Sequence, residues 1–345
     1  MMAEADTLDV RPFVSGDRPR LVDLLCEVWS TKRDVDGHVA ERWWWQSDPP
    51  PVMVVDDRAT GRLVGLCAYI PSVLAGGRRQ ATCAWFVDFY VRRDYQGRGL
   101  GKRLTRAVEE RYAVTASLSQ TAMAYRVFQK LGWSNRTAVP VLMHPWPKRS
   151  LFPGCPAGVR IQAAEIGTVL PDAEAVDSLW ARVNEAYPLL ARRTSADLRR
   201  RYAAQPHRRY TLIRAGRGDE CVGYMIVRVV RSRSGRPIAP PGLIVDCLVH
   251  PDDRETFGAL LGEAAAVLTA AGCSRLWCTT TVPSQLALLR SRGFLSPDTP
   301  LLGRALTGNT KWLTWVATPA AAWVTSAEWY LTLGDCDIDY AWYVD

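Results

Sequence analysis

The sequence contains no long hydrophobic run. Nearly half of its 345 residues are hydrophobic, yet no apolar stretch approaches the ~18 residues that a membrane helix needs. The first six residues are acidic and are not followed by the apolar core of a signal peptide. These absences predict a protein that neither crosses a membrane nor is exported, so its expected compartment is the cytoplasm.

Paired metal ligands are also lacking. The nine cysteines are scattered with no Cys-x-x-Cys, and the four histidines lie near no cysteine pair. We therefore expect neither a bound metal nor a disulfide framework. Cys67, Cys83 and Cys247 lie inside apolar, strand-like runs, which is typical of buried thiols in a reducing compartment.

The length predicts about two domains, each large enough to bury its own core. The formal net charge is +8, and most of this basic excess lies in residues 1–150. A basic excess indicates either nucleic-acid binding or an anionic cofactor. The cofactor is the favoured interpretation, because the glycine-rich segment described next lies in the same half of the chain.

Residues 84–106 carry the strongest functional pattern. The run from Trp85 to Val91 is aromatic and β-branched and predicts a buried strand. It is followed by Gln96-Gly97-Arg98-Gly99-Leu100-Gly101, and then by apolar residues at helical spacing. Three glycines at alternate positions favour a turn whose N–H groups precede a helix N-terminus, which is a site for an anion such as a pyrophosphate.

Two common phosphate-binding motifs do not fit this segment. A Walker loop requires Gly-Lys followed by Ser or Thr, whereas Gly101-Lys102 is followed by Arg103. A dinucleotide fingerprint requires Gly-x-Gly-x-x-Gly and an acidic residue about 20 positions later. Here the spacing is Gly-x-Gly-x-Gly, and residues 115–121 contain no acid.

The segment instead resembles the acyl-CoA loop of the GNAT N-acetyltransferase superfamily, which reads Gln/Arg-x-x-Gly-x-Gly/Ala after a strand. The resemblance includes Asp88-Phe89-Tyr90-Val91 before the loop and Phe128-Gln129-Lys130-Leu131-Gly132-Trp133 after it. It implies an α/β fold with a mixed sheet, acetyl-CoA as co-substrate and no metal. The residues expected at the cofactor are Tyr90, Val91, Gln96, Gly97, Arg98, Gly99, Leu100, Gly101 and Lys102.

The catalytic groups are less firmly indicated. Transfer of an acyl group to an amine needs a base, an oxyanion site and a proton for the leaving thiolate. Asp88 is the candidate acid/base, with a structural carboxylate or a water chain as alternatives. The family places a tyrosine where this chain has Phe128, so we expect Tyr125, one turn earlier, to supply the proton, with Ser119 as a weaker candidate.

The second half of the chain repeats the plan of the first. Residues 245–249 mirror residues 87–91, and residues 290–294 mirror residues 129–133. The glycine loop is not repeated, because Glu255, Thr256 and Phe257 stand where the first half has Gly97, Arg98 and Gly99. We therefore expect a degenerate second copy that does not bind CoA and that either shapes the acceptor site or stabilises the pair.

The expected organisation is a pair of tandem GNAT-like domains. We predict a catalytic domain over residues 1–144 that ends in a strand near Ala138–Met143, a Pro/Gly-rich linker over 145–158, a degenerate domain over 159–318 and an aromatic, acidic tail over 319–345. A helix over residues 35–45 carries Trp43-Trp44-Trp45, a candidate wall of the acceptor groove. The acids of the tail suggest a solvated turn or, alternatively, a lid that attracts a cationic acceptor.

The predicted function is an N-acetyltransferase that moves an acetyl group from acetyl-CoA directly to a primary amine of a small molecule. One alternative is a CoA-binding sensor or scaffold without catalysis, motivated by Phe128. Another is a nucleic-acid-associated protein, motivated by the basic excess. The sequence does not indicate the identity of the acceptor or the oligomeric state.

Overall fold

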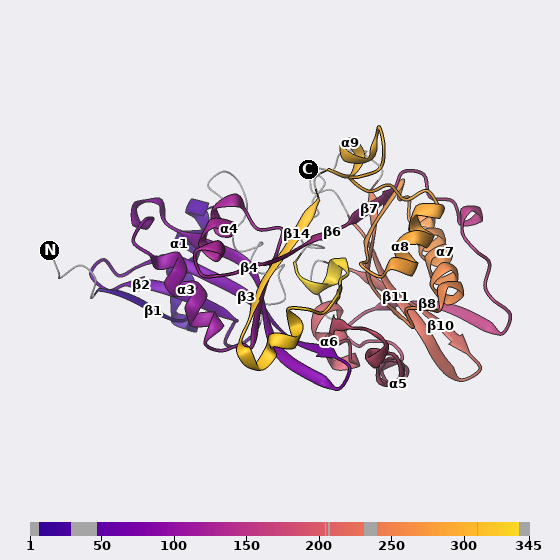
Figure 1. The fold of residues 1–345 in the computed structure, drawn as a ribbon, viewed down its shortest axis with the longest axis horizontal. Helices are drawn as coiled ribbons and strands as arrows, with labels where there is room; N and C mark the ends of the chain where they lie inside the picture. The colour runs from indigo at the N-terminus through magenta and orange to yellow at the C-terminus, as the bar shows by residue number, and fades with distance from the viewer. Residues whose placement is uncertain are drawn as a thin grey trace. The chain divides into compact units, whose positions relative to one another are not determined.

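The computed structural model describes residues 7–28, 47–203, 205, 208–230, 240–308 and 310–337. The predicted helix over residues 35–45, with its three tryptophans, lies outside these ranges. The chain forms two compact units, and each is assembled from separate stretches of sequence (Figure 1). The first unit comprises Met1–Val73, Ala81–Thr137 and Trp312–Ser326, and the second comprises Leu74–Gln80, Ala138–Lys311 and Ala327–Asp345.

The first unit is built on a mixed sheet with the strand order β1-β2-β3-β4-β5-β14-β6. Strands β4 and β5 are parallel, whereas β14 runs antiparallel to β5. The elements are β1 (Leu8–Pro12), α1 (Arg18–Val28), β2 (Val52–Asp57), β3 (Arg62–Gly76), β4 (Arg79–Val91), α3 (Leu100–Glu109), β5 (Val114–Leu118), α4 (Ala122–Gln129), β6 (Asn135–Val139) and β14 (Lys311–Ala317).

The core of this unit forms where helices α3 and α4 pack on the sheet. The apolar positions Leu100, Leu104 and Val108 recur at helical spacing and are all buried. They share one cluster with Phe86 of β4, Phe128 of α4 and other side chains. This packing fixes the start of α3 against the end of β4.

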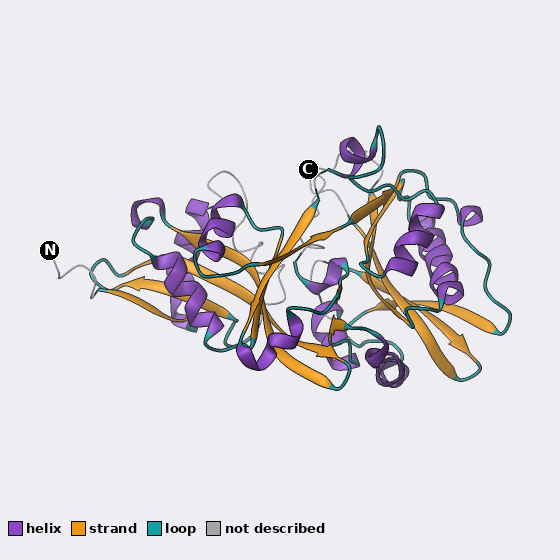
Figure 2. Ribbon diagram, in the orientation of Figure 1, coloured by secondary structure: helices purple, strands orange, loops and turns teal. Residues whose placement is uncertain are grey.

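The second unit has a sheet of the same plan, with the order β7-β13-β12-β11-β10-β8. Helices α7 and α8 belong to this unit (Figure 2), and α7 buries its apolar residues in the core. The elements are β7 (Val141–His144), β8 (Val159–Ile166), α5 (Ala173–Val183), β9 (Leu189–Ala191), α6 (Ser195–Tyr202), β10 (Tyr210–Arg217), β11 (Glu220–Val229), β12 (Pro241–Val249), α7 (Arg254–Ala270), β13 (Arg275–Thr279), α8 (Pro283–Ser291), α9 (Gly303–Thr307) and β15 (Trp329–Tyr330).

The two sheets confirm the predicted internal repeat. In the first, β4 and β5 are parallel, and the other neighbour of β5 in the sheet, β14, is antiparallel. In the second, β12 and β13 are parallel, and the other neighbour of β13 in the sheet, β7, is likewise antiparallel. Mixed α/β architecture with two similar domains is therefore the fold of this chain.

The antiparallel strands that lie beside β5 and β13 in the sheets are exchanged between the two halves of the chain. Strand β14, from the second half, pairs with β5 of the first unit, and β7, from the first half, pairs with β13 of the second unit. The range predicted as one strand, Ala138–Met143, is divided between β6, at the edge of the first sheet, and β7, in the second sheet. Pro140, which has no N–H to donate, separates β6 from β7, and the compact units differ from the contiguous ranges 1–144 and 159–318.

The segment predicted as a linker, residues 145–158, contains one short 3₁₀ turn and no other regular element. It is nevertheless attached to the second unit, because the Phe152 ring is buried in that unit's core cluster. None of the helices in the described ranges is long and apolar enough to cross a lipid bilayer.

Candidate functional site

The last residues of β4 have one edge that is not paired with β5. The recorded pairing of the two strands runs from Cys83 opposite Val114 to Phe86 opposite Ser117, whereas β4 continues to Val91. On its other edge, the chain stays attached to β3 through the Arg92 N–H, which donates to the Val64 carbonyl at 2.8 Å. The two parallel strands therefore part at the point where the predicted site begins.

The regular alternation of β4 is also interrupted there. Phe86, Phe89 and Val91 all pack into the same core cluster, although Phe86 and Phe89 are three positions apart. A strand with strict alternation would place them on opposite faces, so the phase changes at residues 87–88. From Phe89 onward, alternation places Tyr90 on the face opposite this cluster.

The backbone at Val91 faces the open edge of β4. Arg92 donates toward β3, and since residues two apart point to the same edge, Tyr90 also faces β3 and Val91 faces away from it. The Gln96 side-chain amide donates to the Val91 carbonyl at 2.9 Å. Gln96 thus closes the turn after β4. Of Tyr90 and Val91, which were both expected at the cofactor, Val91 is the one whose N–H is directed to the open edge.

The glycine-rich segment forms a loop that leads directly into α3. Gly97 and Gly99 have φ angles of +82° and +77°, a conformation in which side chains other than glycine are strained. Within the ranges that the structure describes, the N–H groups of residues 97–99 donate to no protein acceptor. These donors and the positive end of the α3 dipole make the loop suitable for an anion.

The basic side chains near the loop have different roles. Arg103 donates to the Leu8 carbonyl at 2.7 Å and so ties α3 to β1. Lys102 is exposed. The Arg98 guanidinium lies 5.0 Å from the centre of the Tyr95 ring, and the Tyr95 hydroxyl donates to the Asp57 carboxylate at 2.6 Å.

The structure places Phe128 and Tyr125 of α4 in different environments. Phe128 is buried and its ring stacks on Trp133 at 4.2 Å, so it belongs to the core. Tyr125 is half-buried, and its ring contacts the Arg136 guanidinium at 4.6 Å. The same guanidinium lies 4.0 Å from the ring of Trp312, a residue of β14.

Sequence reasoning missed an acidic group on α1 close to β4. The Glu27 carboxylate is paired with the buried Arg92 guanidinium and accepts a 3.3 Å hydrogen bond from the Tyr90 hydroxyl. Burial and the Glu27 charge raise the pKa of Tyr90. Nothing in the local pattern of α1 signals this contact, because Glu27 and Arg92 lie 65 residues apart.

In the second unit, the position of the loop is taken by a capped helix. Asp253 precedes α7 and accepts hydrogen bonds from the Thr256 N–H at 3.0 Å and from the Thr256 hydroxyl at 2.7 Å. The helix N-terminus is therefore satisfied by a carboxylate of the chain itself. Asp246, the counterpart of Asp88, is fully buried and paired with Arg193 at 2.9 Å.

The tail contributes to the same buried cluster. Asp335 is fully buried and lies 2.7 Å from Arg193, so the prediction of a solvated acidic turn is wrong at this residue. Two buried carboxylates share one guanidinium here, and the Thr332 hydroxyl donates to Asp335 at 3.1 Å. Residues 338–345 lie outside the described ranges, and the lid interpretation stays a prediction.

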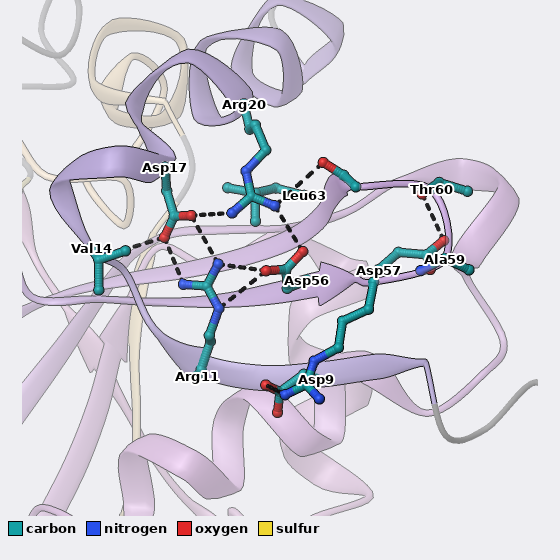
Figure 3. Close-up of polar contacts among 12 residues, drawn as sticks. Asp9, Arg11, Val14, Asp17, Arg20, Asp56, Asp57, Ala59, Thr60 and Leu63 are labelled. Carbon is teal, nitrogen blue, oxygen red and sulfur yellow. Dashed lines mark hydrogen bonds and ion pairs between the residues drawn. The ribbon is translucent and has the colours of Figure 1, made fainter.

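A second ionic network joins β1, α1 and β2 in the first unit (Figure 3). Arg11 and Arg20 each contact both Asp17 and Asp56. The hydrogen bond from Arg11 is the main cause that lowers the pKa of Asp17, to about 2. The Asp17 carboxylate also accepts a hydrogen bond from the Val14 N–H at 2.9 Å, just before α1.

Two parted parallel strands followed by a glycine-rich anion loop at a helix start define an α/β domain of the acyltransferase class. Residues 18–133 match the model of the Acetyltransferase (GNAT) family. No curated protein matches the sequence.

Solved structures share the fold over nearly the whole chain. A GCN5-related N-acetyltransferase from Anabaena variabilis is 13% identical, with a TM-score of 0.60 over 89% of this chain and 72% of that chain. A tandem GNAT protein from the clavulanic acid biosynthesis pathway is 18% identical, with a TM-score of 0.51 over 90% and 98%. An N-myristoyltransferase from Saccharomyces cerevisiae is 11% identical, with a TM-score of 0.51 over 91% and 82%. These likenesses show the tandem GNAT fold.

Proposed function

We propose that this protein is an acetyl-CoA-dependent N-acetyltransferase whose first unit transfers an acetyl group directly to a primary amine of a small molecule. The observation that carries this proposal is the loop before α3, where the N–H groups of residues 97–99 donate to no acceptor in the described part of the chain, beside the edge of β4 that β5 leaves unpaired. The loop would bind the pyrophosphate of acetyl-CoA, with Arg98 and Lys102 adding positive charge. The cytoplasm is the expected compartment.

In this proposal, the open edge of β4 takes the reacting end of the cofactor. The Val91 N–H would stabilise the oxyanion that forms when the amine attacks the thioester carbonyl. The amine loses its proton to Asp88 or to water, and the carbon–sulfur bond breaks as the tetrahedral intermediate collapses. Tyr125 would donate its proton to the leaving thiolate, since Phe128 has none to give.

The second unit is proposed to bind no CoA. Asp253 occupies the N-terminus of α7 with its own carboxylate, and Asp246 is held in a buried ion pair. A phosphate at this helix would have to displace a bonded carboxylate and would be repelled by its charge. We propose that the second unit either shapes the acceptor site or stabilises the pair.

The first test is calorimetric titration of acetyl-CoA into the purified chain, with Gly99→Asp measured in parallel. We expect one site in the wild type, at least a 100-fold weaker affinity in the variant, and a melting temperature that stays close to that of the wild type. Two sites would contradict the silent second unit. Unchanged affinity in the variant would contradict the loop assignment.

Titration of myristoyl-CoA beside acetyl-CoA shows which acyl-chain length the protein binds. A screen of amines, with detection of the released CoA thiol, identifies the acceptor. Acetyl-CoA binding without turnover of any amine would favour the alternative of a CoA-binding sensor, which the buried Phe128 motivates. DNA or RNA binding at low salt, without CoA binding, would favour the nucleic-acid alternative.

A further inference from the structure

We propose that Tyr95 is a positioning residue that holds Arg98 ready for the diphosphate group of CoA. This inference rests on the proposed function of the loop and adds side chains that the loop pattern does not contain. Tyr95 directly precedes the loop, and its ring lies 5.0 Å from the Arg98 guanidinium. A guanidinium placed over an aromatic face is attracted to the ring and keeps its N–H groups available for an anion.

The ring of Tyr95 is itself anchored. Its hydroxyl donates to Asp57 at 2.6 Å, and Asp57 is 4% exposed. The same carboxylate accepts the Ala59 N–H at 3.0 Å and the Thr60 hydroxyl at 2.9 Å; Figure 3 draws these two contacts. The hydrogen bond from Tyr95 is the main cause that lowers the pKa of Asp57. Asp57 is therefore a fixed, fully ionised acceptor for the tyrosine.

Asp57, Tyr95 and Arg98 thus form a chain of contacts from the end of β2 to the loop. An exposed arginine loses side-chain freedom when it binds a ligand, and a guanidinium already held on a ring loses less. The arrangement explains how an arginine outside the helix is directed at the loop.

The test is a double-mutant cycle measured by calorimetry with acetyl-CoA. We expect Arg98→Leu and Tyr95→Leu each to weaken acetyl-CoA binding about fivefold. This change corresponds to the free energy of a cation–π contact at an exposed site. If Tyr95 acts through Arg98, Tyr95→Leu has almost no further effect in the Arg98→Leu background. Tyr95→Phe keeps the ring and loses only the anchor, so it should weaken binding about twofold.

Arg58→Ala is the matched control. Arg58 is exposed, adjoins Asp57 and is paired with Asp9, so its removal lowers the local positive charge without touching Tyr95. We expect the affinity of Arg58→Ala for acetyl-CoA to stay within twofold of the wild type.

The affinity of Arg98→Leu is also measured for the 3′-dephospho form of acetyl-CoA. An equal loss of affinity for both ligands assigns Arg98 to the diphosphate. A loss confined to acetyl-CoA would overturn that assignment in favour of the 3′-phosphate.

Additive effects of Tyr95→Leu and Arg98→Leu, with normal wild-type binding, would overturn the positioning role and leave the proposed function intact. Absence of acetyl-CoA binding by the wild type would overturn both. If Tyr95→Leu fails to fold, as its melting curve would show, Tyr95→Phe with and without Arg98→Leu completes the cycle, and an unchanged affinity in Tyr95→Phe would contradict the role of the anchor.

Discussion

Phe128 and Tyr125 lie one helical turn apart on α4 but differ in their surroundings. The Phe128 ring is part of the core, whereas Tyr125 keeps a partly exposed side chain beside the Arg136 guanidinium. If Tyr125 protonates the leaving thiolate, Tyr125→Phe should lower kcat about 100-fold and leave KM for acetyl-CoA unchanged, because only the transition state loses an interaction. Steady-state release of CoA thiol with an accepted amine measures both constants.

Tyr112→Phe is the control for the loss of a tyrosine hydroxyl, since the Tyr112 ring packs against Tyr69 of β3. Its kcat should stay within twofold of the wild type. An undiminished kcat in Tyr125→Phe would show that the thiolate takes its proton from another group or from water.

Asp17 makes the stability of the first unit depend on pH. Its pKa is lowered in the folded state to about 2, from an ordinary value of 3.8. The stabilisation is therefore fully present above about pH 4 and is lost as the pH falls toward 2. The shift corresponds to about 2 kcal/mol at pH 7, and Asp17→Asn should remove at least that amount, because Arg11 and Arg20 then share only Asp56.

Urea unfolding at pH 7 and at pH 2.5 tests this effect. The wild type and Asp17→Asn should differ clearly at pH 7 and much less at pH 2.5. Asp23→Asn, at an exposed position of the same helix, should match the wild type at both values. A constant difference between wild type and Asp17→Asn across this range would contradict the assigned role.

The loop residues could be predicted from the sequence because their requirement is local. Gly97 and Gly99 adopt positive φ angles, and the glycine pattern itself indicates such a turn. The Asp57–Tyr95 contact could not be predicted, since it joins residues 38 positions apart and neither side chain belongs to a recognised spacing. Contacts of this kind depend on how the strands and loops are placed in three dimensions.

At the scale of elements, local periodicity predicts the strand and the helix around the loop but not every strand partner. The strand predicted over Trp85–Val91 lies in β4, and the helix predicted after the glycine loop is α3. The pairing of β14 with β5 was missed, because the alternation of a strand shows which face is buried but not which strand lies beside it. The same reason explains the error at β7.

Strand β14 should stabilise the first unit although its sequence lies in the second half. Leu313 is completely buried and pairs with Leu118 of β5. Leu313→Ala should lower the free energy of unfolding by about 2–4 kcal/mol, the usual cost of a cavity at a buried leucine. Leu301→Ala is the control, because Leu301 is fully exposed, and it should change this energy by less than about 0.5 kcal/mol.

To assign the effect to the first unit, acetyl-CoA binding is measured at increasing urea concentration, in parallel with unfolding. We expect Leu313→Ala to lose binding at a lower urea concentration than the wild type, with normal affinity before unfolding. Loss of stability without an earlier loss of binding would mean that β14 does not support the cofactor loop.

At the scale of the whole molecule, neither half of the sequence contains a complete sheet. Residues 1–144 include β5 and β6 but lack β14, which lies between them in the strand order. Residues 145–345 include β13 but lack β7, its antiparallel neighbour. Each missing strand exposes an unpaired edge and part of a core, which favours aggregation. The repeat was visible in the sequence, whereas this mutual dependence was not.

Expression of the two halves separately tests this dependence. Each half alone should be insoluble or lack a cooperative thermal transition, whereas co-expression should give a soluble 1:1 complex, because exchanged strands can complete both sheets when both chains are present. A chimera in which residues 310–326 follow residues 1–144 through a flexible linker supplies β14 in the first fragment and should restore a cooperative transition. Circular dichroism and size-exclusion chromatography measure these outcomes, and a cooperative transition in the unmodified fragment 1–144 would show that β14 is dispensable.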